Sequence, residues 1–392
     1  MNKQTNTPEL RFPEFDEEWE KRKLGEVVNY KNGGSFESLV KNHGVYKLIT
    51  LKSVNTEGKL CNSGKYIDDK CVETLCNDTL VMILSEQAPG LVGMTAIIPN
   101  NNEYVLNQRV AALVPKQFID SQFLSKLINR NQKYFSVRSA GTKVKNISKG
   151  HVENFNFLSP DYTEQQKIGN FFSKLDRQIE LEEKKLELFE QQKKGYMQKI
   201  FSQQLRFKDE NGNDYPKWEN KLLGNLVNIT MGQSPSSKNY TENSNYTTLV
   251  QGNADLNNGY IQPRIYTKQI TKLAEVNDIL LTVRAPVGKI GRAQLKACIG
   301  RGVCAIKGDS FIYYFLELFD LQNKWIRFSQ GSTFESISGN EIKNIDIAYP
   351  INEERQKISE FLSKLDELLK NQLLKVEQLK QRKKGLLQKM FV

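Results

Sequence analysis

The chain has 392 residues, 39% of them hydrophobic and 26% charged, which suffices for two or more domains that each bury a hydrophobic core. No run of about 18 apolar residues predicts a membrane span, and the polar, acidic opening lacks the apolar core of a secretory signal, so we expect a cytoplasmic protein. The net charge of +11 favours a polyanionic partner.

The cysteines and histidines indicate neither a disulfide framework nor a metal site. The cysteine count is odd, no two cysteines form a CxxC pair, and the two histidines, His43 and His151, are far apart in the sequence. We expect free or half-buried thiols at Cys61, Cys71, Cys76, Cys298 and Cys304.

The first 160 residues are predicted to form a mixed α and β domain. Runs of β-forming residues, separated by Gly, Asn and Ser clusters, indicate short strands. These runs lie at 46–51, 79–84, 95–98 and 110–114, and a helix is expected near 121–135. The polar loops carry Gln, Ser, Asn and Arg, which suit the reading of base edges but are also ordinary loop residues.

Basic residues gather late in this domain and again in a later part of the chain. Residues 104–152 include nine Lys or Arg and one acidic residue, and residues 279–308 include six Lys or Arg and no acidic residue. A solvated face normally mixes both signs, whereas a surface that neutralises phosphates does not. The distribution therefore favours nucleic acid as the polyanion.

A long helix is predicted from 163 to 201, where apolar residues recur in alternating steps of four and three without a proline. This is the heptad pattern of a coiled coil. Its seam comprises Ile168, Phe172, Leu175, Ile179, Leu186, Phe189, Tyr196 and Ile200, with polar exceptions at Glu182 and Lys193. Asp161 and Thr163 are candidate N-caps, and Gly195 should weaken the helix locally.

A second mixed domain and a second long helix follow. Strand-like runs lie at 246–250, 279–283 and 302–306, with a helix expected near 311–328. The seam returns at Ile358, Leu362, Leu365, Leu369, Val376, Leu379, Leu386 and Met390, with Gln372 and Lys383 as polar exceptions. Asn352 is the candidate cap and Gly385 repeats the glycine of the first helix.

The two halves are diverged copies of one unit. QKIGNFFSKLD at 166–176 matches QKISEFLSKLD at 356–366, and KKGYMQKIF at 193–201 matches KKGLLQKMF at 383–391, both at an offset of 190 residues. The openings repeat as well, since LRF at 10–12 returns at 205–207 and Trp19 returns as Trp218. The interiors differ, which suggests one scaffold doing the same job on two targets; duplication with drift is the alternative.

These elements predict an α+β protein with an internal pseudo-two-fold repeat. Globular domains are expected at 1–160 and 205–350, and helices at 161–204 and 351–392. An antiparallel coiled coil would hold the domains apart, since some 38 helical residues span roughly 57 Å. In such a pair, Glu182 opposite Gln372 and the two lysines would fix the register. A dimerisation coil is the alternative interpretation.

Catalytic motifs are missing from the sequence. It has no GxxxxGK[ST] phosphate loop, no GxGxxG fingerprint after a strand, no HExxH and no nucleophile elbow. It also lacks the Asn-Pro-Pro-aromatic motif with which adenine methyltransferases hold a flipped base. We therefore expect a binding protein that carries no cofactor or metal of its own.

The chain resembles the specificity subunit of type I restriction-modification systems in its duplicated unit, in the LGE and LGN openings after Trp19 and Trp218, and above all in the EQQKIGNFFSKLD and ERQKISEFLSKLD helices. The resemblance covers essentially the whole chain. It implies that each globular part is a target recognition domain that reads one half of a bipartite, asymmetric site in double-stranded DNA. The helices would set the gap between the half-sites.

The resemblance also implies the partners. Two modification subunits would dock on the helices and methylate adenine with S-adenosylmethionine, and restriction subunits would translocate and cut DNA with ATP and Mg. This chain would be the non-catalytic subunit that recognises the DNA target. The target sequence and the length of the gap do not follow from the resemblance.

Candidate DNA contacts come from the basic stretches and the polar loops, because Arg suits bidentate guanine contacts whereas Lys and Thr suit phosphates. In the first domain they are Gln87, Arg109, Arg138, Thr142, Lys143 and Lys145. In the second domain they are Arg284, Lys289, Arg301, Ser332 and Thr333. Two other functions stay open at this point, a self-contained DNA methyltransferase or nuclease with an unrecognised site and a structural coiled-coil adaptor.

Overall fold

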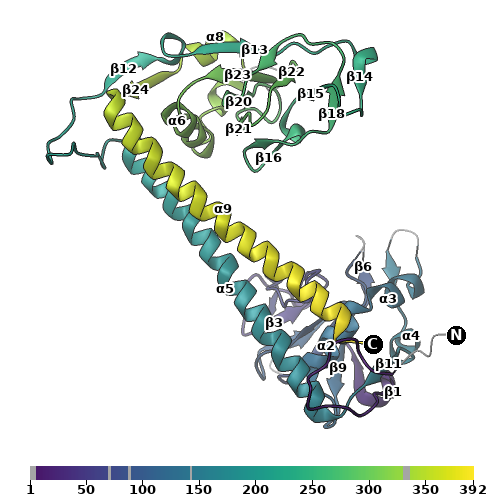
Figure 1. Ribbon diagram of the computed structural model, residues 1–392. Helices are drawn as coiled ribbons and strands as arrows, with labels where there is room; N and C mark the ends of the chain where they lie inside the picture. Colours follow the sequence, from purple (N-terminus) through teal and green to yellow (C-terminus); the bar gives the residue numbers. More distant parts are fainter. Residues whose placement is uncertain (1–5, 69–71, 87–89, 142–143, 330–335) are drawn as a thin grey trace. The chain divides into compact units, whose positions relative to one another are not determined.

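The computed structural model describes residues 6–68, 72–86, 90–141, 144–329 and 336–392, and Figure 1 labels many of its elements. The chain divides into two units. Unit 1 comprises Met1–Glu183 and Leu374–Val392, and unit 2 comprises Lys184–Leu373. Each unit therefore contains one globular part, the beginning of the long helix that follows it and the end of the other long helix.

The globular part of unit 1 is built on an antiparallel four-stranded sheet in the order β2-β9-β5-β7. A second sheet has the order β4-β3-β8, in which β3 and β8 are parallel. The strands are β2 (Val28–Asn32), β3 (Tyr46–Ile49), β4 (Tyr66–Ile67), β5 (Leu80–Ile83), β7 (Thr95–Ile97), β8 (Tyr104–Leu106) and β9 (Val110–Pro115). The four predicted strand runs of this domain correspond to β3, β5, β7 and β9.

Short helices and two strand pairs complete unit 1. The pairs are β1 (Glu20–Lys23) with β11 (Asn156–Ser159) and β6 (Ser85–Glu86) with β10 (Lys145–Asn146). The helices are α1 (Leu24–Val27), η1 (Glu37–Leu39), α2 (Ser121–Arg130), α3 (Gln132–Arg138) and α4 (Lys149–Glu153). The predicted helix near 121–135 is present but is divided into α2 and α3, because Asn131 ends α2 and its side-chain amide donates to the Leu127 carbonyl at 2.8 Å.

Unit 2 repeats this plan with larger sheets, in the orders β13-β23-β20-β21-β17-β16 and β14-β18-β15-β22-β19, and with β12 paired to β24. Its strands are β12 (Glu219–Leu222), β13 (Asn228–Met231), β14 (Tyr240–Thr241), β15 (Thr247–Val250), β16 (Leu256–Asn257), β17 (Tyr260–Ile261), β18 (Ile265–Thr267), β19 (Leu273–Ala274), β20 (Ile279–Thr282), β21 (Ile290–Arg292), β22 (Ala297–Ile299), β23 (Val303–Lys307) and β24 (Asp346–Tyr349).

The helices of unit 2 are η2 (Leu223–Asn225), η3 (Ser237–Asn239), η4 (Asn253–Asp255), α6 (Ser310–Leu321), α7 (Ile326–Ser329) and α8 (Gly339–Lys343). The sequence predicted one helix where α6 and α7 now stand. The chain breaks between them at Asn323, whose φ of 54° lies in the left-handed region.

The two predicted long helices are α5 (Tyr162–Phe201) and α9 (Asn352–Lys389). Asp161 caps α5 as predicted, since its carboxylate accepts from the backbone N–H of Thr163 at 2.7 Å and of Glu164 at 3.2 Å. Glu164 in turn is fully buried and forms a bidentate pair with Arg11. In unit 2, Glu354 and Arg206 form the same buried pair.

Residues at or just beyond the end of a long helix complete each globular core. In unit 1, Phe391, two residues beyond the end of α9, stacks on Phe123, with ring centroids 5.3 Å apart, and both rings meet Trp19. In unit 2, Phe201 at the end of α5 lies 5.0 Å from Phe311, which meets Trp218. The helix ends are therefore part of the hydrophobic cores, where buried aromatic side chains contribute the most apolar area.

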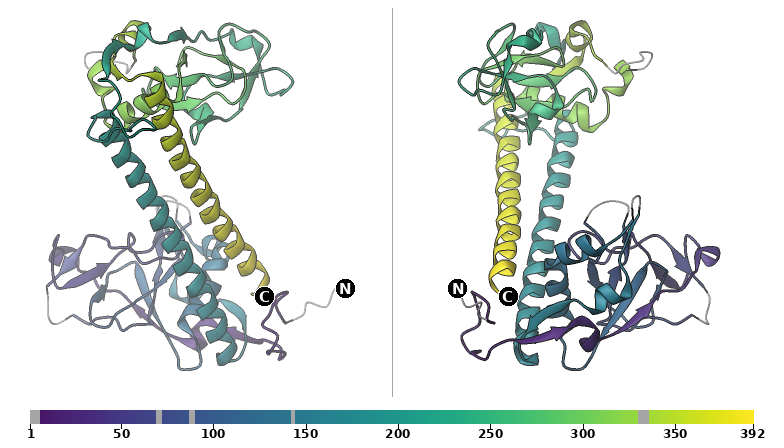
Figure 2. Two further views of the ribbon diagram at one scale, coloured as in Figure 1. Left: turned by 60° about the vertical axis from the view of Figure 1, so that its left-hand side comes forward. Right: turned by 90° about the vertical axis from the view of Figure 1, so that its right-hand side faces the viewer.

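Within each unit, α5 and α9 run antiparallel. In unit 1 the start of α5 lies beside the end of α9 (Figure 2), and the pairs Asp176–Lys383 and Glu182–Lys375 each measure 2.5 Å. In unit 2 the end of α5 lies beside the start of α9, with Lys193 2.6 Å from Asp366. Residue numbers rise along one helix as their partners' numbers fall along the other, which gives the antiparallel direction.

The predicted heptad seam is turned away from solvent. The first six apolar seam residues of each helix make twelve in all. None of the twelve is exposed, and seven are buried, namely Ile168, Phe172, Leu175, Ile179, Ile358, Leu362 and Val376. The first two seam positions of each helix belong to the globular cores. Ile168 and Phe172 pack in the core that contains Trp19, and Ile358 and Leu362 pack in the core that contains Trp218. The heptad pattern therefore records domain packing as well as helix pairing.

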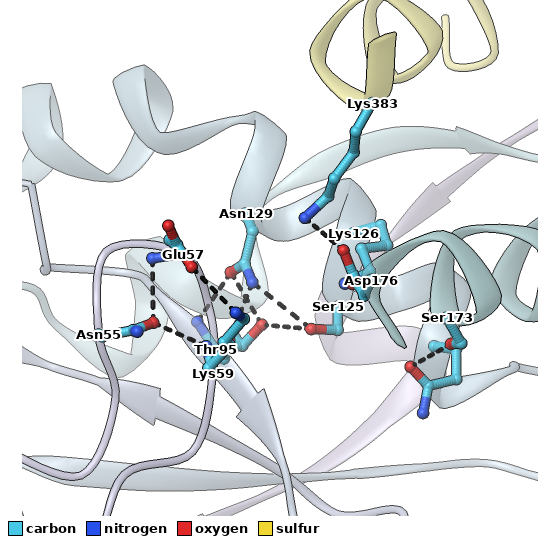
Figure 3. A network of polar contacts seen from close by, with 11 residues as sticks. Asn55, Glu57, Lys59, Thr95, Ser125, Lys126, Asn129, Ser173, Asp176 and Lys383 are labelled. Atoms are coloured by element: carbon cyan, nitrogen blue, oxygen red, sulfur yellow. Dashed lines mark hydrogen bonds and ion pairs between the residues drawn. The ribbon is translucent and has the colours of Figure 1, made fainter. Parts of the chain in front are cut away.

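Three charged groups meet where each helix pair joins its globular part. In unit 1, Lys126 on α2 and Lys383 on α9 both contact Asp176 on α5 (Figure 3). Burial lowers the pKa of Lys126, and the two lysines hold the pKa of Asp176 below its ordinary value against the opposite effect of burial. The single carboxylate is thus the shared counter-ion of two partly buried ammonium groups.

Unit 2 reverses the signs of this cluster. Lys193 on α5 lies 2.8 Å from Glu317 on α6 and 2.6 Å from Asp366 on α9. Burial raises the pKa of Glu317 although Lys193 pulls it down, so the ionised form of Glu317 is less favourable in the fold than in water. One ammonium group here faces two carboxylates.

The two clusters should respond differently to loss of a carboxylate charge. Asp176→Asn leaves Lys126 and Lys383 without a counter-ion and should lower the free energy of unfolding by about 3 kcal/mol. Glu317→Gln leaves Lys193 paired with Asp366 and should change the free energy of unfolding by less than about 1 kcal/mol. Urea unfolding of the full chain measures both, and equal losses for the two variants would contradict the assignment.

Gly195 and Gly385 should each weaken a helix without a packing reason. A Cβ built on either residue meets no atom within 4 Å, and both residues have helical backbones. Alanine at either position should therefore raise the free energy of unfolding by about 0.5–1 kcal/mol. Gly169→Ala is the contrasting variant, because its Cβ would lie 2.4 Å from an Asp120 carboxylate oxygen and should destabilise the chain. Thermal or urea unfolding of the three variants gives the comparison.

Candidate nucleic-acid interface

Unit 2 contains a polar pocket of about 640 Å³ where four segments of its globular part meet. The loop after β13 contributes Ser234, the end of β15 contributes Gln251, the end of β20 contributes Arg284, and the turn between β22 and β23 contributes Arg301. Turns that end neighbouring strands place these side chains together, although they are far apart in the sequence.

The pocket holds two guanidinium groups that are free to bind a ligand. Arg284 and Arg301 are both exposed, and neither side chain has a hydrogen-bonding or ionic partner among the residues that the structure describes. The neighbouring polar groups are ordered, since Gln251 donates to the Tyr240 hydroxyl at 2.6 Å and Ser234 accepts from the backbone N–H of Arg301 at 3.1 Å. Free guanidinium groups beside ordered hydroxyls and amides suit phosphate oxygens and base edges.

Unit 1 has the same turn at the same place. Leu84 N–H donates to the Arg109 carbonyl at 3.0 Å, as Val283 N–H donates to the Gly302 carbonyl at 2.9 Å. Gly33 N–H donates to the Val110 carbonyl as Gly232 N–H donates to that of Val303. The turn at 107–109 therefore corresponds to the turn at 300–302.

Three of the predicted contacts in unit 1 are exposed. Arg109 lies on the turn with a φ of 68°, and Lys145 lies on β10. Their segments are neighbours, because Leu84 bonds to the Arg109 carbonyl on one side and accepts from Ile147 N–H on the other. Arg138, at the end of α3, stacks on Tyr134 with its guanidinium 3.8 Å from the ring centroid.

In unit 2 the structure brings together two of the predicted contacts and separates a third. Arg284 and Arg301 share the pocket, whereas Lys289 forms an ion pair with Asp320 on α6 at 3.0 Å.

Five further candidates from the two units lie outside the described residues, namely Gln87, Thr142, Lys143, Ser332 and Thr333.

Several basic residues that suggested a phosphate-binding surface have structural partners instead. Lys126 pairs with Asp176, Lys296 pairs with Glu275 at 2.8 Å, and Arg130 donates to the carbonyl oxygens of Gln388 and Val392. The number of basic residues in a stretch therefore overstates the positive charge that is free to meet a ligand.

Sequence reasoning missed the uncharged members of the pocket. Gly33 and Ser35 return as Gly232 and Ser234 at the offset of 199 residues that also relates Trp19 to Trp218, so this signal was present in the sequence. Tyr240 and Gln251 carry no such signal, because the two interiors differ there.

The described residues contain free thiols and no metal-binding cluster. They contain no group of three His, Cys, Asp or Glu side chains placed to hold a metal ion. The four cysteines among them are free thiols, and burial raises the pKa of Cys304 to about 12, so this thiol stays protonated at neutral pH. No helix in the described part of the chain is long and apolar enough to cross a membrane.

Known proteins resemble this chain over nearly its whole length. The putative type I restriction enzyme MjaX specificity subunit of Methanocaldococcus jannaschii is 27% identical over 412 residues, which cover 98% of this chain and 95% of that protein. The MjaVIII specificity subunit of the same organism is 22% identical with the same coverage.

Two solved structures share the fold. The S subunit of a type I restriction-modification system from M. genitalium aligns with a TM-score of 0.65 at 18% identity, over 98% of this chain and 99% of that one. A chain from a study of complex assembly and conformational transition of the type I R-M system aligns with a TM-score of 0.60 at 22% identity, over 95% and 97%.

The family model of the type I restriction modification DNA specificity domain matches the chain twice, at residues 16–191 and 215–378. These two segments contain the two globular parts and most of both long helices. The chain therefore belongs to the type I restriction-modification DNA specificity family.

Proposed function

We propose that this chain is the DNA-recognition subunit of a type I restriction-modification complex and that each globular part reads one half of a bipartite, asymmetric site. The observation that carries the proposal is the corresponding turn in the two units, which presents different side chains on a repeated framework. A duplicated framework with unlike reading loops is what two different half-sites require.

The chain is proposed to be non-catalytic, with the chemistry in its partners. Two modification subunits would supply adenine methylation with S-adenosylmethionine, and restriction subunits would supply cleavage with ATP and Mg. The long helices are proposed to set the gap between the half-sites, because each of them is continuous from one unit into the other. The family membership supports this division of labour.

The two other functions considered from the sequence make different demands on the chain. A self-contained methyltransferase or nuclease would modify or cut DNA when purified alone. A structural adaptor would not need arginines in a polar pocket that have no partner among the described residues, and the loss of their charge would leave it unaffected. The proposal predicts the opposite result in both cases.

An exchange of residues 20–150 for those of a relative with a different target tests the two-reader model. One half of the methylated sequence should change and the other half should remain, because unit 2 keeps its own loops. Methylation-aware sequencing of host DNA, with the chain and its modification partner present, gives the result. A change in both halves, or in neither, would refute the model.

Removal of the free guanidinium groups should weaken DNA binding far more than removal of paired lysines. The double variant Arg284→Ala, Arg301→Ala should lose at least about 30-fold in affinity for the cognate duplex, since each lost contact weakens binding by about 1–3 kcal/mol. The matched control is Lys289→Ala, Lys296→Ala, which removes two charges of the same unit that are already paired. Titration of the assembled complex at fixed salt measures both, and equal losses would count against the pocket.

A further inference from the structure

The corresponding turns of the two units present a side chain at one shared position. Asn107 N–H donates to the Ile49 carbonyl at 3.1 Å, as Gly300 N–H donates to that of Val250 at 2.8 Å. On the other side of each turn, Leu84 N–H donates to the Arg109 carbonyl in unit 1, and Val283 N–H donates to the Gly302 carbonyl in unit 2. The residue between these fixed points is Gln108 in unit 1 and Arg301 in unit 2.

Arg301 has the properties of a base-reading arginine. Its side chain is exposed, its backbone N–H is held by Ser234, and no carboxylate among the described residues pairs with it. A guanidinium presents two parallel N–H groups, which match the O6 and N7 acceptors of guanine. No other base offers two acceptors in the major groove.

Gln108 is oriented by a neighbouring carboxylate. Its side-chain NH₂ donates to Glu37 at 2.6 Å, and Glu37 also accepts from the Ser35 hydroxyl at 3.0 Å. The hydrogen bond from Gln108 is the main cause that lowers the pKa of Glu37, so the carboxylate stays ionised. Because an ionised carboxylate only accepts hydrogen bonds, the amide nitrogen of Gln108 must face it.

This orientation leaves one N–H and the carbonyl oxygen of the Gln108 side chain without a partner among the described residues. Adenine offers one acceptor, N7, beside one donor, the N6 amino group, and so matches this pair. Guanine offers two acceptors and would leave the carbonyl oxygen of Gln108 unpaired. The negative charge of Glu37 also disfavours a phosphate at this position.

We propose that this position selects a purine in each half-site, with Arg301 of unit 2 requiring guanine and Gln108 of unit 1 requiring adenine. The inference rests on the proposed function, since it assigns two base contacts within the two readers. It makes the shared turn a point at which one substitution converts one base preference into the other.

The experiment is Arg301→Gln in the full chain, assembled with its modification subunits. Methylation-aware sequencing should show one G·C pair of one half-site replaced by A·T or relaxed, with the other half-site and the gap unchanged. Lys296→Gln is the matched control, because it removes one positive charge of the same unit through a residue already paired with Glu275. The Arg301 side chain makes no hydrogen bond or ion pair with the described residues, so the substitution should leave the fold intact.

A binding measurement covers the case in which Arg301→Gln abolishes methylation. The complex is titrated with duplexes that carry the wild-type site and each single base-pair change in the affected half-site. Wild type should discriminate at one G·C pair by about 5- to 150-fold, and the variant should lose that discrimination there and nowhere else. Weaker binding to every duplex by one factor would identify a phosphate contact and overturn the inference.

Unit 1 provides the reciprocal measurement. Gln108→Ala should relax one A·T pair in the other half-site, whereas Gln117→Ala, an exposed glutamine beyond the far end of β9, should change nothing. An unchanged motif in both Arg301→Gln and Gln108→Ala overturns the inference while the two-reader model stands. If the wild-type complex recognises no bipartite site at all, the proposed function itself fails.

Discussion

The packing of one phenylalanine at or just beyond the end of each long helix is the contact on which both globular parts depend. Phe391 meets both Trp19 and Phe123, and Phe201 meets Phe311, which in turn meets Trp218. Burial of a phenylalanine side chain stabilises a fold by roughly 1.5–3 kcal/mol relative to its exposure. Neither globular part therefore has a complete hydrophobic core without the end of a long helix that begins in the other unit.

This dependence explains which residues repeat between the two halves. The buried pair Arg11–Glu164 returns as Arg206–Glu354, because each pair joins the start of a long helix to the LRF segment. A buried carboxylate without its arginine would be strongly destabilising, so neither member changes easily by itself. The repeated motifs are thus the residues that fasten helices to globular parts.

The sequence was sufficient to predict the framework. Heptad spacing located α5 and α9, because buried residues on a helix must recur with its period. The offset of 190 residues between matching motifs revealed the duplication. Competition between a side chain and the backbone for a hydrogen bond was harder to predict. The side-chain amide of Asn131 donates to the Leu127 carbonyl and ends α2 inside an otherwise helical pattern.

The candidate site could be predicted only in part. Arg284 and Arg301 stood out as basic residues, but Lys126 and Arg130 stood out equally, and the structure gives those two internal partners. Whether an arginine is free or paired depends on acids that are distant in sequence, such as Asp176 for Lys126. Composition counts the charges of a segment and carries no information on these partners.

The middle of each long helix lies outside the two hydrophobic cores. Leu181 and Leu188 on α5, and Leu368 and Leu374 on α9, are among the large apolar side chains exposed to solvent. The division between the units falls in these stretches, after Glu183 and after Leu373. A change of helix length there would remove little buried apolar area from either core, whereas the same change near Phe172 or Phe391 would open a core directly. The framework therefore separates the residues that stabilise each reader from the helical stretches that connect them.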